Sequence, residues 1–207
     1  MQHGDPPSDS LVWDLETLEW LMSNGQEFRA YRFLQQGDYE KARCQLEPLA
    51  AEGSVWSLFT LGWLYESGNL GSPDLNTAVA HYARGAELGD AEAQFRAGRL
   101  LVNLGAEQRA RSVFAFGAEA GSISCSYWLG RLQLEGRGGA ADISEGLTWL
   151  RRACSRGHLY AKRDLILHEF RSSRVVLRRI YLWLRLAKFS WQVGKEAWKN
   201  PESELLR

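Results

Sequence analysis

Cysteine is scarce in this sequence of 207 residues, and no two cysteines are close together. Cys44, Cys125 and Cys154 are an odd number without a tight pair, which argues against a disulfide framework and against a thiolate metal site. The first ten residues, MQHGDPPSDS, are acidic and carry proline, unlike a secretory signal. We therefore expect a cytoplasmic protein.

Signatures of enzymes and cofactor sites are also missing. There are four histidines, and only His158, Asp164, His168 and Glu169 lie near each other, in a segment that lacks the second histidine of a zinc-binding helix. The segment GRGGA, residues 136–140, lacks the lysine of a P-loop and is expected to be a loop. No nucleophile is paired with a base. We expect no catalytic residue, no metal and no cofactor, although an enzyme remains a third hypothesis.

Net charge is zero, but its distribution is uneven. Residues 1–53 hold ten acids and four bases, residues 54–170 hold twelve of each, and residues 171–207 hold three acids and nine bases. The balance runs from −6 through 0 to +6. Such asymmetry fits either two interaction surfaces or ordinary solvated faces.

The most informative feature that is present is internal repetition. The segments Leu61–Asp90 and Leu129–His158 superpose at an offset of 68 residues, and a third copy around Gly98 lies between them. Repetition with this period is typical of a solenoid of small supersecondary units. The apolar fraction of 45% suffices for a continuous core.

Each repeat has the pattern of two helices. Leu58, Leu61 and Leu64 recur at helical spacing before Gly68, and Asp74 follows as the N-terminal signal of a second helix. Gly62, Gly98 and Gly130 lie inside the first helices, where each costs about 1 kcal/mol relative to alanine. A close approach of a neighbouring helix is the expected compensation.

The joint pattern resembles the Sel-one-like (Sel1-like) repeat family, relatives of tetratricopeptide repeats. The residues of 54–89 and 122–157 that match it are Leu61, Gly62, Leu64, Tyr65, Gly68, Asp74, Ala78, Tyr82, Ala86 and Gly89, followed by Leu129, Gly130, Leu132, Gly136, Asp142, Trp149, Ala153 and Gly157. The middle repeat drops four loop residues and the aspartate, so a tighter hairpin is expected there. The resemblance implies an all-α, right-handed α-α superhelix of antiparallel helix pairs, a TPR-like solenoid.

The expected organisation is a repeat array between two caps. Residues 1–25 form a tail and an N-terminal capping helix, and residues 195–207 form a C-terminal tail. The array spans 26–194, with repeats at about 26–53, 54–89, 90–121, 122–157 and 158–194. Pro48 is expected to kink the second helix of the first repeat.

Binding is expected on the first helix of each repeat, at positions that the packing pattern does not use. In three successive repeats these positions hold tryptophans and arginines, a composition typical of binding hot spots. The candidate partner-binding residues are Trp56, Trp63, Arg96, Arg99, Asn103, Trp128, Arg131 and Glu135. The alternative for Trp56 and Trp128 is burial against adjacent repeats.

A second candidate surface is the basic amphipathic helix expected near residues 171–193. Four basic residues interrupt 175–193, so it is not expected to span a bilayer. Its apolar face would hold Val176, Ile180, Trp183, Leu184, Ala187 and Trp191, and its basic face Arg171, Arg174, Arg178, Arg185 and Lys188. Such a helix is either a cap on the last repeat or a docking surface for an anionic membrane or an acidic partner.

Taken together, these patterns favour binding over catalysis. The resemblance implies a non-catalytic adaptor or scaffold that holds a protein or peptide in its concave groove, and the arginines expected there favour an acidic partner. Peripheral membrane attachment through the C-terminal helix is the alternative. Nucleic acid is disfavoured because no recognised module accompanies the basic stripe.

Overall fold

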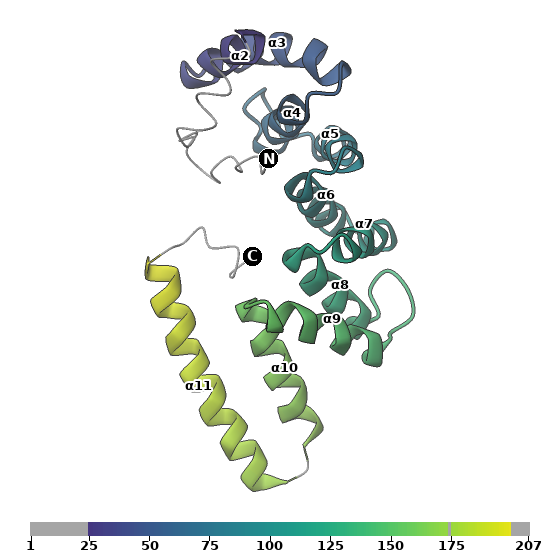
Figure 1. Cartoon of the computed structure of the whole chain (residues 1–207), viewed down its shortest axis with the longest axis vertical. Helices are drawn as coiled ribbons and strands as arrows, with labels where there is room; N and C mark the ends of the chain where they lie inside the picture. Colours follow the sequence, from purple (N-terminus) through teal and green to yellow (C-terminus); the bar gives the residue numbers. More distant parts are fainter. Residues whose placement is uncertain (1–24, 174, 200–207) are drawn as a thin grey trace. The chain divides into compact units, whose positions relative to one another are not determined.

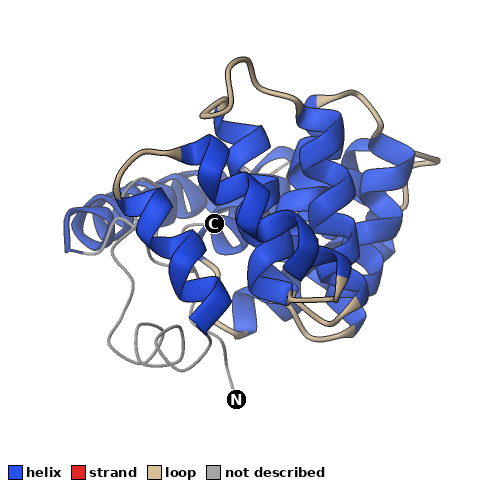
Figure 2. Ribbon diagram, turned by 90° about the horizontal axis from the view of Figure 1, so that it is seen from above, coloured by secondary structure: helices blue, strands red, loops and turns tan. Residues whose placement is uncertain are grey.

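The computed structural model describes residues 25–173 and 175–199, and these residues form ten helices and no strand (Figures 1 and 2). The helices are α2 (Gly25–Gln35), α3 (Tyr39–Ala51), α4 (Val55–Ser67), α5 (Leu75–Glu87), α6 (Ala91–Asn103), α7 (Glu107–Glu119), α8 (Ile123–Glu135), α9 (Ile143–Ser155), α10 (Leu159–Ser172) and α11 (Val176–Lys199). The expected all-α repeat solenoid is confirmed.

The chain divides into two compact halves, one ending at Gly105 and the other beginning at Ala106. In the N-terminal half, consecutive helices from α2 to α6 pack on one another, and in the C-terminal half those from α7 to α11 do the same. Each half has an apolar core along these contacts. The N-terminal core cluster holds Ala30, Leu34, Ala42, Leu46, Ala50, Leu58, Leu61 and Leu64, and the C-terminal cluster holds Tyr127, Leu150, Ala153 and Ala161.

Side-chain caps and glycines set the helix ends where the sequence predicts them. The side chain of Asp74 accepts a hydrogen bond from the Thr77 N–H, and Asp142 does the same for Glu145. Gly68 ends α4 with φ of 74°, and Gly136 ends α8 with φ of 67°. L-residues with a side chain avoid this left-handed conformation, which explains glycine at both helix ends.

Glycines inside the first helices permit the close helix approach that the sequence predicts. A Cβ atom at Gly62 would lie 2.7 Å from the Tyr82 ring on α5. A Cβ atom at Gly130 would lie 2.8 Å from the carbonyl oxygen of Gly146, on α9. The absence of these side chains therefore lets the two helices of each hairpin approach closely.

The middle repeat has the short connection that was expected, residues 104–106 between α6 and α7. The connection from α8 to α9 is longer and folds back onto the start of α7. There, Arg137 donates two hydrogen bonds to Glu107, at 2.6 and 2.8 Å, and Arg111 donates one to the Ala140 carbonyl at 3.0 Å. A Cβ atom at Gly138 would lie only 2.3 Å from the Glu107 carbonyl oxygen, so this contact requires glycine.

The two ends of the array differ from the sequence expectations or lie beyond what the structure describes. The expected N-terminal capping helix lies in residues 1–24, outside the described residues, and Gly25 begins α2. At the other end, α11 continues to Lys199, past its expected end near Val193. Residues 195–199 include Lys, Glu and Ala, which are good helix formers, so nothing ends the helix at 195. Pro48 lies inside α3, which continues to Ala51.

Candidate partner-binding surface

The expected partner-binding residues of the N-terminal half lie on α4 and α6. Trp56 and Trp63 are on α4, whereas Arg96, Arg99 and Asn103 are on α6. Trp56, Trp63 and Arg96 are half-buried, while Arg99 and Asn103 are exposed. The exposed part of this surface is therefore smaller than the sequence suggests.

Arg96 connects the two helices instead of projecting freely. Its guanidinium pairs with Glu66 of α4 at 3.4 Å and with Glu92 of its own helix at 3.2 Å, and it lies 5.5 Å from the centre of the Phe59 ring. The Arg96 side chain is only 17% exposed. Burial alone would lower the pKa of Arg96, but Tyr82, Glu92 and Glu66 raise it on balance. Arg96 is thus a charged bridge that fixes α6 against α4.

Tyr82 completes this bridge from α5. Its hydroxyl donates a hydrogen bond to the Glu66 carboxylate at 2.8 Å, and its ring fills the space beside Gly62. Burial, together with the nearby Glu66 charge, raises the pKa of Tyr82 well above its usual value. The Glu66 carboxylate is therefore held by one phenol and one guanidinium, from two different helices.

Arg99 differs from Arg96 because it has no ion pair with any residue that the structure describes. It is exposed, and its guanidinium lies 5.9 Å from the centre of the Phe95 ring. α4 and α6 run in the same direction, since the antiparallel α5 separates them. Trp63 precedes Glu66 by three residues on α4, and Arg99 follows Arg96 by three residues on α6, so each lies about one turn from the Arg96–Glu66 ion pair. A common face of Trp63 and Arg99 stays a prediction.

The two tryptophans of α4 are used partly for packing, so they are only partly available to a partner. Trp56 and Trp63 both pack against the N-terminal core cluster, and Trp63 meets Tyr39 edge to face at 6.3 Å between ring centres. Thr60, which lies between them on α4, is buried, and its hydroxyl donates to the Trp56 carbonyl. Both tryptophans are half-buried, so each contributes to packing and keeps part of its surface exposed.

The remaining expected residues, Trp128, Arg131 and Glu135, lie on α8 in the C-terminal half. Trp128 is half-buried and stacks on Phe114 of α7, with ring centres 5.8 Å apart and planes 16° apart. The predicted alternative, burial against an adjacent repeat, therefore describes Trp128 best. A single surface that joins these residues to those of α4 and α6 stays a prediction.

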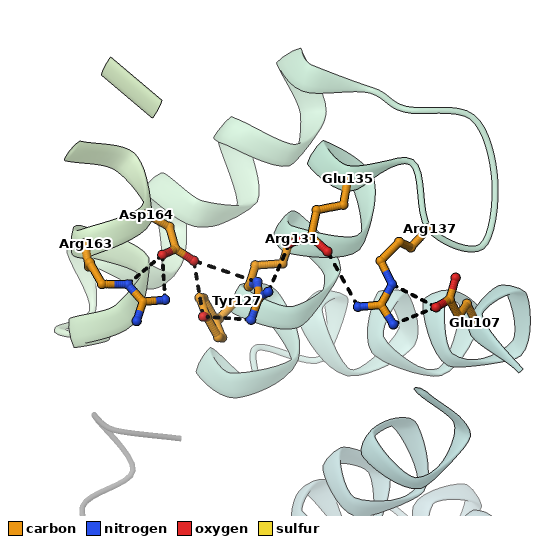
Figure 3. Close-up of polar contacts among 7 residues, drawn as sticks. All are labelled: Glu107, Tyr127, Arg131, Glu135, Arg137, Arg163 and Asp164. Atoms are coloured by element: carbon orange, nitrogen blue, oxygen red, sulfur yellow. Dashed lines mark hydrogen bonds and ion pairs between the residues drawn. The ribbon is translucent and has the colours of Figure 1, made fainter. Parts of the chain in front are cut away.

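Arg131 is the centre of a second charged network (Figure 3). It donates to Glu135 at 3.0 Å and lies 3.8 Å from the carboxylate of Asp164, which comes from α10. Tyr127 also contacts Asp164, at 3.2 Å, and Arg163 holds the other oxygen of that carboxylate at 2.7 Å. Burial and the Asp164 charge raise the pKa of Tyr127 to about 12. Arg131 is therefore already paired within the protein.

Glu135 links this network to the α8–α9 connection. Its carboxylate accepts from Arg131 and also lies 3.5 Å from Arg137, whose guanidinium is bound mainly to Glu107 (Figure 3). The chain from Asp164 through Arg131, Glu135 and Arg137 to Glu107 alternates in charge. It ties α10, α8 and α7 together, and an incoming partner would have to compete with it.

The sequence did not identify Glu66, Tyr82, Tyr127 or Asp164 as part of these networks. A usable signal exists, because each network pairs an arginine of one first helix with an acid of a neighbouring first helix. Arg96 and Glu66 are 30 residues apart, and Arg131 and Asp164 are 33 apart, each close to the repeat period. A search for opposite charges about one repeat apart on successive first helices is the signal that could have indicated these pairs.

The second candidate surface is only partly basic. Arg171, Arg178, Arg185 and Lys188 are exposed, and Arg178 lies 3.9 Å from Glu169. Arg174 lies outside the described residues. The expected apolar face of α11 is exposed at Ile180, Trp183, Leu184, Ala187 and Trp191, while Leu182 and Phe189 are buried instead. No helix within the described residues is long and apolar enough to cross a membrane.

The part of the chain that the structure describes contains no cluster of three metal-ligating side chains. His158, the central histidine of the weak cluster considered from the sequence, is buried and caps α10, since its Nδ1 accepts from the Ala161 N–H at 3.1 Å. Cys125 is buried, and burial raises the pKa of the Cys154 thiol. A buried thiol and a thiol with a raised pKa are both weak nucleophiles, so neither Cys125 nor Cys154 has the character of an activated cysteine.

Comparison with known proteins agrees with this architecture. Residues 57–90 and 123–158 match the model of the Sel1 repeat family. A protective antigen present in uropathogenic Escherichia coli strains, which displays an SLR fold, shares 23% identity with a TM-score of 0.64, over 92% of this chain and 44% of that chain. A Sel1 repeat protein from Oxalobacter formigenes shares 21% identity with a TM-score of 0.62, over 86% of this chain and 79% of that chain.

This chain therefore spans less than half the length of the Escherichia coli protein. No curated protein matches it. At these identities the two solved structures establish the fold, while the matched segments coincide with α4–α5 and α8–α9, the two repeats that carry the full sequence pattern. The chain therefore contains two segments that match the Sel1 repeat and has the fold of Sel1-like repeat proteins.

Proposed function

We propose that this protein is a non-catalytic adaptor or scaffold that binds a protein or peptide on the exposed side of its first helices. Sel1 repeats generally serve as protein–protein interaction scaffolds. Function on such arrays resides in the side chains that packing leaves free. The proposal therefore depends on which first-helix side chains are free.

The observation that carries the proposal is the state of Arg99. Its exposed guanidinium has no ion pair within the described residues, and both Arg99 and the half-buried Trp63 lie about one turn from the Arg96–Glu66 ion pair. The ion pairs of Arg96 with Glu66 and Glu92 fix α6 against α4. Because the two helices are already held in place, less conformational entropy is lost when a partner binds Arg99 and Trp63.

These side chains favour an acidic partner segment. Arginine holds carboxylates and phosphates through paired hydrogen bonds, and the tryptophan edge offers apolar contact beside it. Asn103, exposed one turn beyond Arg99, adds a donor and an acceptor. Arg131 and Glu135 have the equivalent positions on α8, but they pair with each other, so we assign them a secondary role.

The test is charge reversal at Arg99 in the full-length protein, with Arg109→Glu as the control. Arg109 is likewise exposed, but it lies on α7, a second helix. Affinity purification with mass spectrometry should recover a partner that wild type and Arg109→Glu retain and Arg99→Glu loses. With that partner purified, Arg99→Glu should weaken binding by about 2 kcal/mol or more, close to thirtyfold.

A melting temperature near that of wild type is expected for Arg99→Glu, because the side chain is exposed. Unfolding of this variant would show that Arg99 is structural. Equal affinity of the purified partner for both variants would remove the proposed face from consideration. A cytoplasmic location is part of the proposal, and cell fractionation tests it.

A second candidate, attachment to a membrane or an acidic partner through α11, is favoured by one observation. The large apolar side chains of α11 that the sequence would assign to a cap on the last repeat are exposed, with Ile180 at 52% and Trp191 at 77%. α11 therefore offers an apolar surface beyond the one that holds it to α10.

A further inference from the structure

Helix α11 is apolar on two opposite faces, only one of which is packed. Leu182 and Phe189 are 1% and 3% exposed, and α11 packs on α10. At 100° per residue, Ile180, Leu184 and Trp191 lie on the opposite side of the helix from Leu182. The packing of α11 on α10 thus uses one face and leaves the other in solvent.

The unpacked side of α11, here called its outer face, carries large side chains along most of the helix. Its members are Leu177, Ile180, Trp183, Leu184 and Trp191, which are 52–78% exposed, and Tyr181 at its border is 59% exposed. From Leu177 to Trp191 the face extends about 21 Å at 1.5 Å per residue. A row of exposed large apolar side chains is typical of an interaction site.

Positive charge borders the outer face, and of its bases Arg178 pairs with Glu169 of α10. From Arg171 to Lys195 the sequence has seven bases and no acid. Arg185, Lys188 and Lys195 are exposed and form no ion pair with any residue that the structure describes. Arg179, on the opposite border, lies 4.8 Å from the centre of the Phe170 ring. The occupant of this surface must therefore be apolar in its middle and negative around it.

We propose that the outer face of α11 lies in the plane of a membrane surface that contains anionic lipids. Its apolar row would enter the boundary between headgroups and acyl chains, and the lysines and arginines beside it would contact lipid phosphates. Tryptophan and tyrosine at the borders suit this depth, since each has an apolar ring and one polar atom. This inference rests on the second candidate above and names its partner.

The shape of the outer face favours a bilayer over an acidic protein segment. A single helix with an exposed face is convex, so a protein partner would need a complementary groove of matching length. A bilayer that contains anionic lipids adapts to a convex helix and has a net negative surface charge. An interfacial helix of this kind needs no membrane-spanning segment, in agreement with the helices described here.

The test is flotation of the full-length protein with vesicles of phosphatidylcholine, alone or with phosphatidylglycerol added. Binding should require phosphatidylglycerol and fall as salt is raised. Leu184→Glu and Trp191→Glu should each lower the partition coefficient at least about tenfold, and so should the double variant Lys188→Glu, Lys195→Glu. All four positions are exposed, so melting temperatures should stay near that of wild type.

The matched control is Phe116→Glu, because Phe116 is 62% exposed but lies on α7. This variant should bind vesicles like wild type. Absence of wild-type binding to anionic vesicles, or retention of binding by Leu184→Glu, would overturn the proposal. If the α11 variants instead lose an acidic protein partner while vesicle binding never occurs, the outer face is a protein-docking surface and the membrane assignment is wrong.

Arg99→Glu separates this inference from the adaptor function. It should bind anionic vesicles normally while losing its protein partner, and Trp191→Glu should show the reverse. Failure of vesicle binding with Arg99-dependent capture intact would refute only the membrane proposal. Loss of Arg99-dependent capture with vesicle binding intact would refute only the adaptor face.

Discussion

Replacement of Gly130 by alanine tests the close contact between α8 and α9. The new Cβ atom would lie 2.8 Å from the Gly146 carbonyl oxygen and 3.0 Å from Leu150 Cγ. The nearest atom belongs to the backbone of a packed helix, so relief requires moving that helix. Overpacking of this kind costs about 1 to 3 kcal/mol, whereas alanine regains about 1 kcal/mol of helix propensity. Because the nearest atom belongs to the backbone, we expect a cost in the upper part of that range and hence a net loss of about 1 to 2 kcal/mol.

Gly194→Ala is the matched control for this substitution. Gly194 also lies inside a helix, α11, but no atom lies within 4 Å of its added Cβ, so alanine should stabilise the protein by up to about 1 kcal/mol. Urea unfolding followed by circular dichroism measures both changes. For a chain of this size, each kcal/mol corresponds to about 2 to 4 °C in melting temperature. A Gly130→Ala protein as stable as wild type would show that α8 and α9 do not approach this closely.

Two further predictions concern the C-terminal half. Because the pKa of Tyr127 is raised to about 12, the folded state keeps a proton that the unfolded state loses above pH 10, so stability should fall between pH 10 and 12. Tyr127→Phe should lessen that fall, and denaturant midpoints across this range measure it; an identical slope in the variant would contradict it. Ala106 is the N-cap residue of α7 and provides no side-chain hydrogen bond to the helix. Ala106→Ser should therefore raise stability by about 1 kcal/mol in urea unfolding. An unchanged midpoint would show that the introduced hydroxyl does not reach the α7 N–H groups.

The repeat pattern predicts the helix pairs because each boundary has a local chemical cause. Asp74 and Asp142 cap the second helices, and Gly68 and Gly136 end the first. The contact at Gly130 was also predictable, since a glycine inside a helix needs a compensating neighbour. Features that depend on one or two adjacent turns are therefore readable from the sequence.

The candidate surface was harder to predict because its state depends on contacts between repeats. Arg96 and Arg99 differ by less than one turn, yet one is bridged to Glu66 and the other has no ion pair within the described residues. Helical periodicity also cannot distinguish two apolar faces of one helix, so it did not single out Leu182 and Phe189 as the packed side of α11. The choice depends on which face meets α10.

The connection between α8 and α9 determines when α7 can become stable during synthesis of the chain. The first turn of α7 is held by Arg137, through Glu107, and Arg111 is held by the Ala140 carbonyl, in each case about 30 positions further along. During synthesis, α7 leaves the ribosome without these contacts and without a side-chain cap of its own. A nascent chain that ends before residue 136 should thus expose a frayed α7 to proteases, and lengthening it past residue 142 should protect the helix.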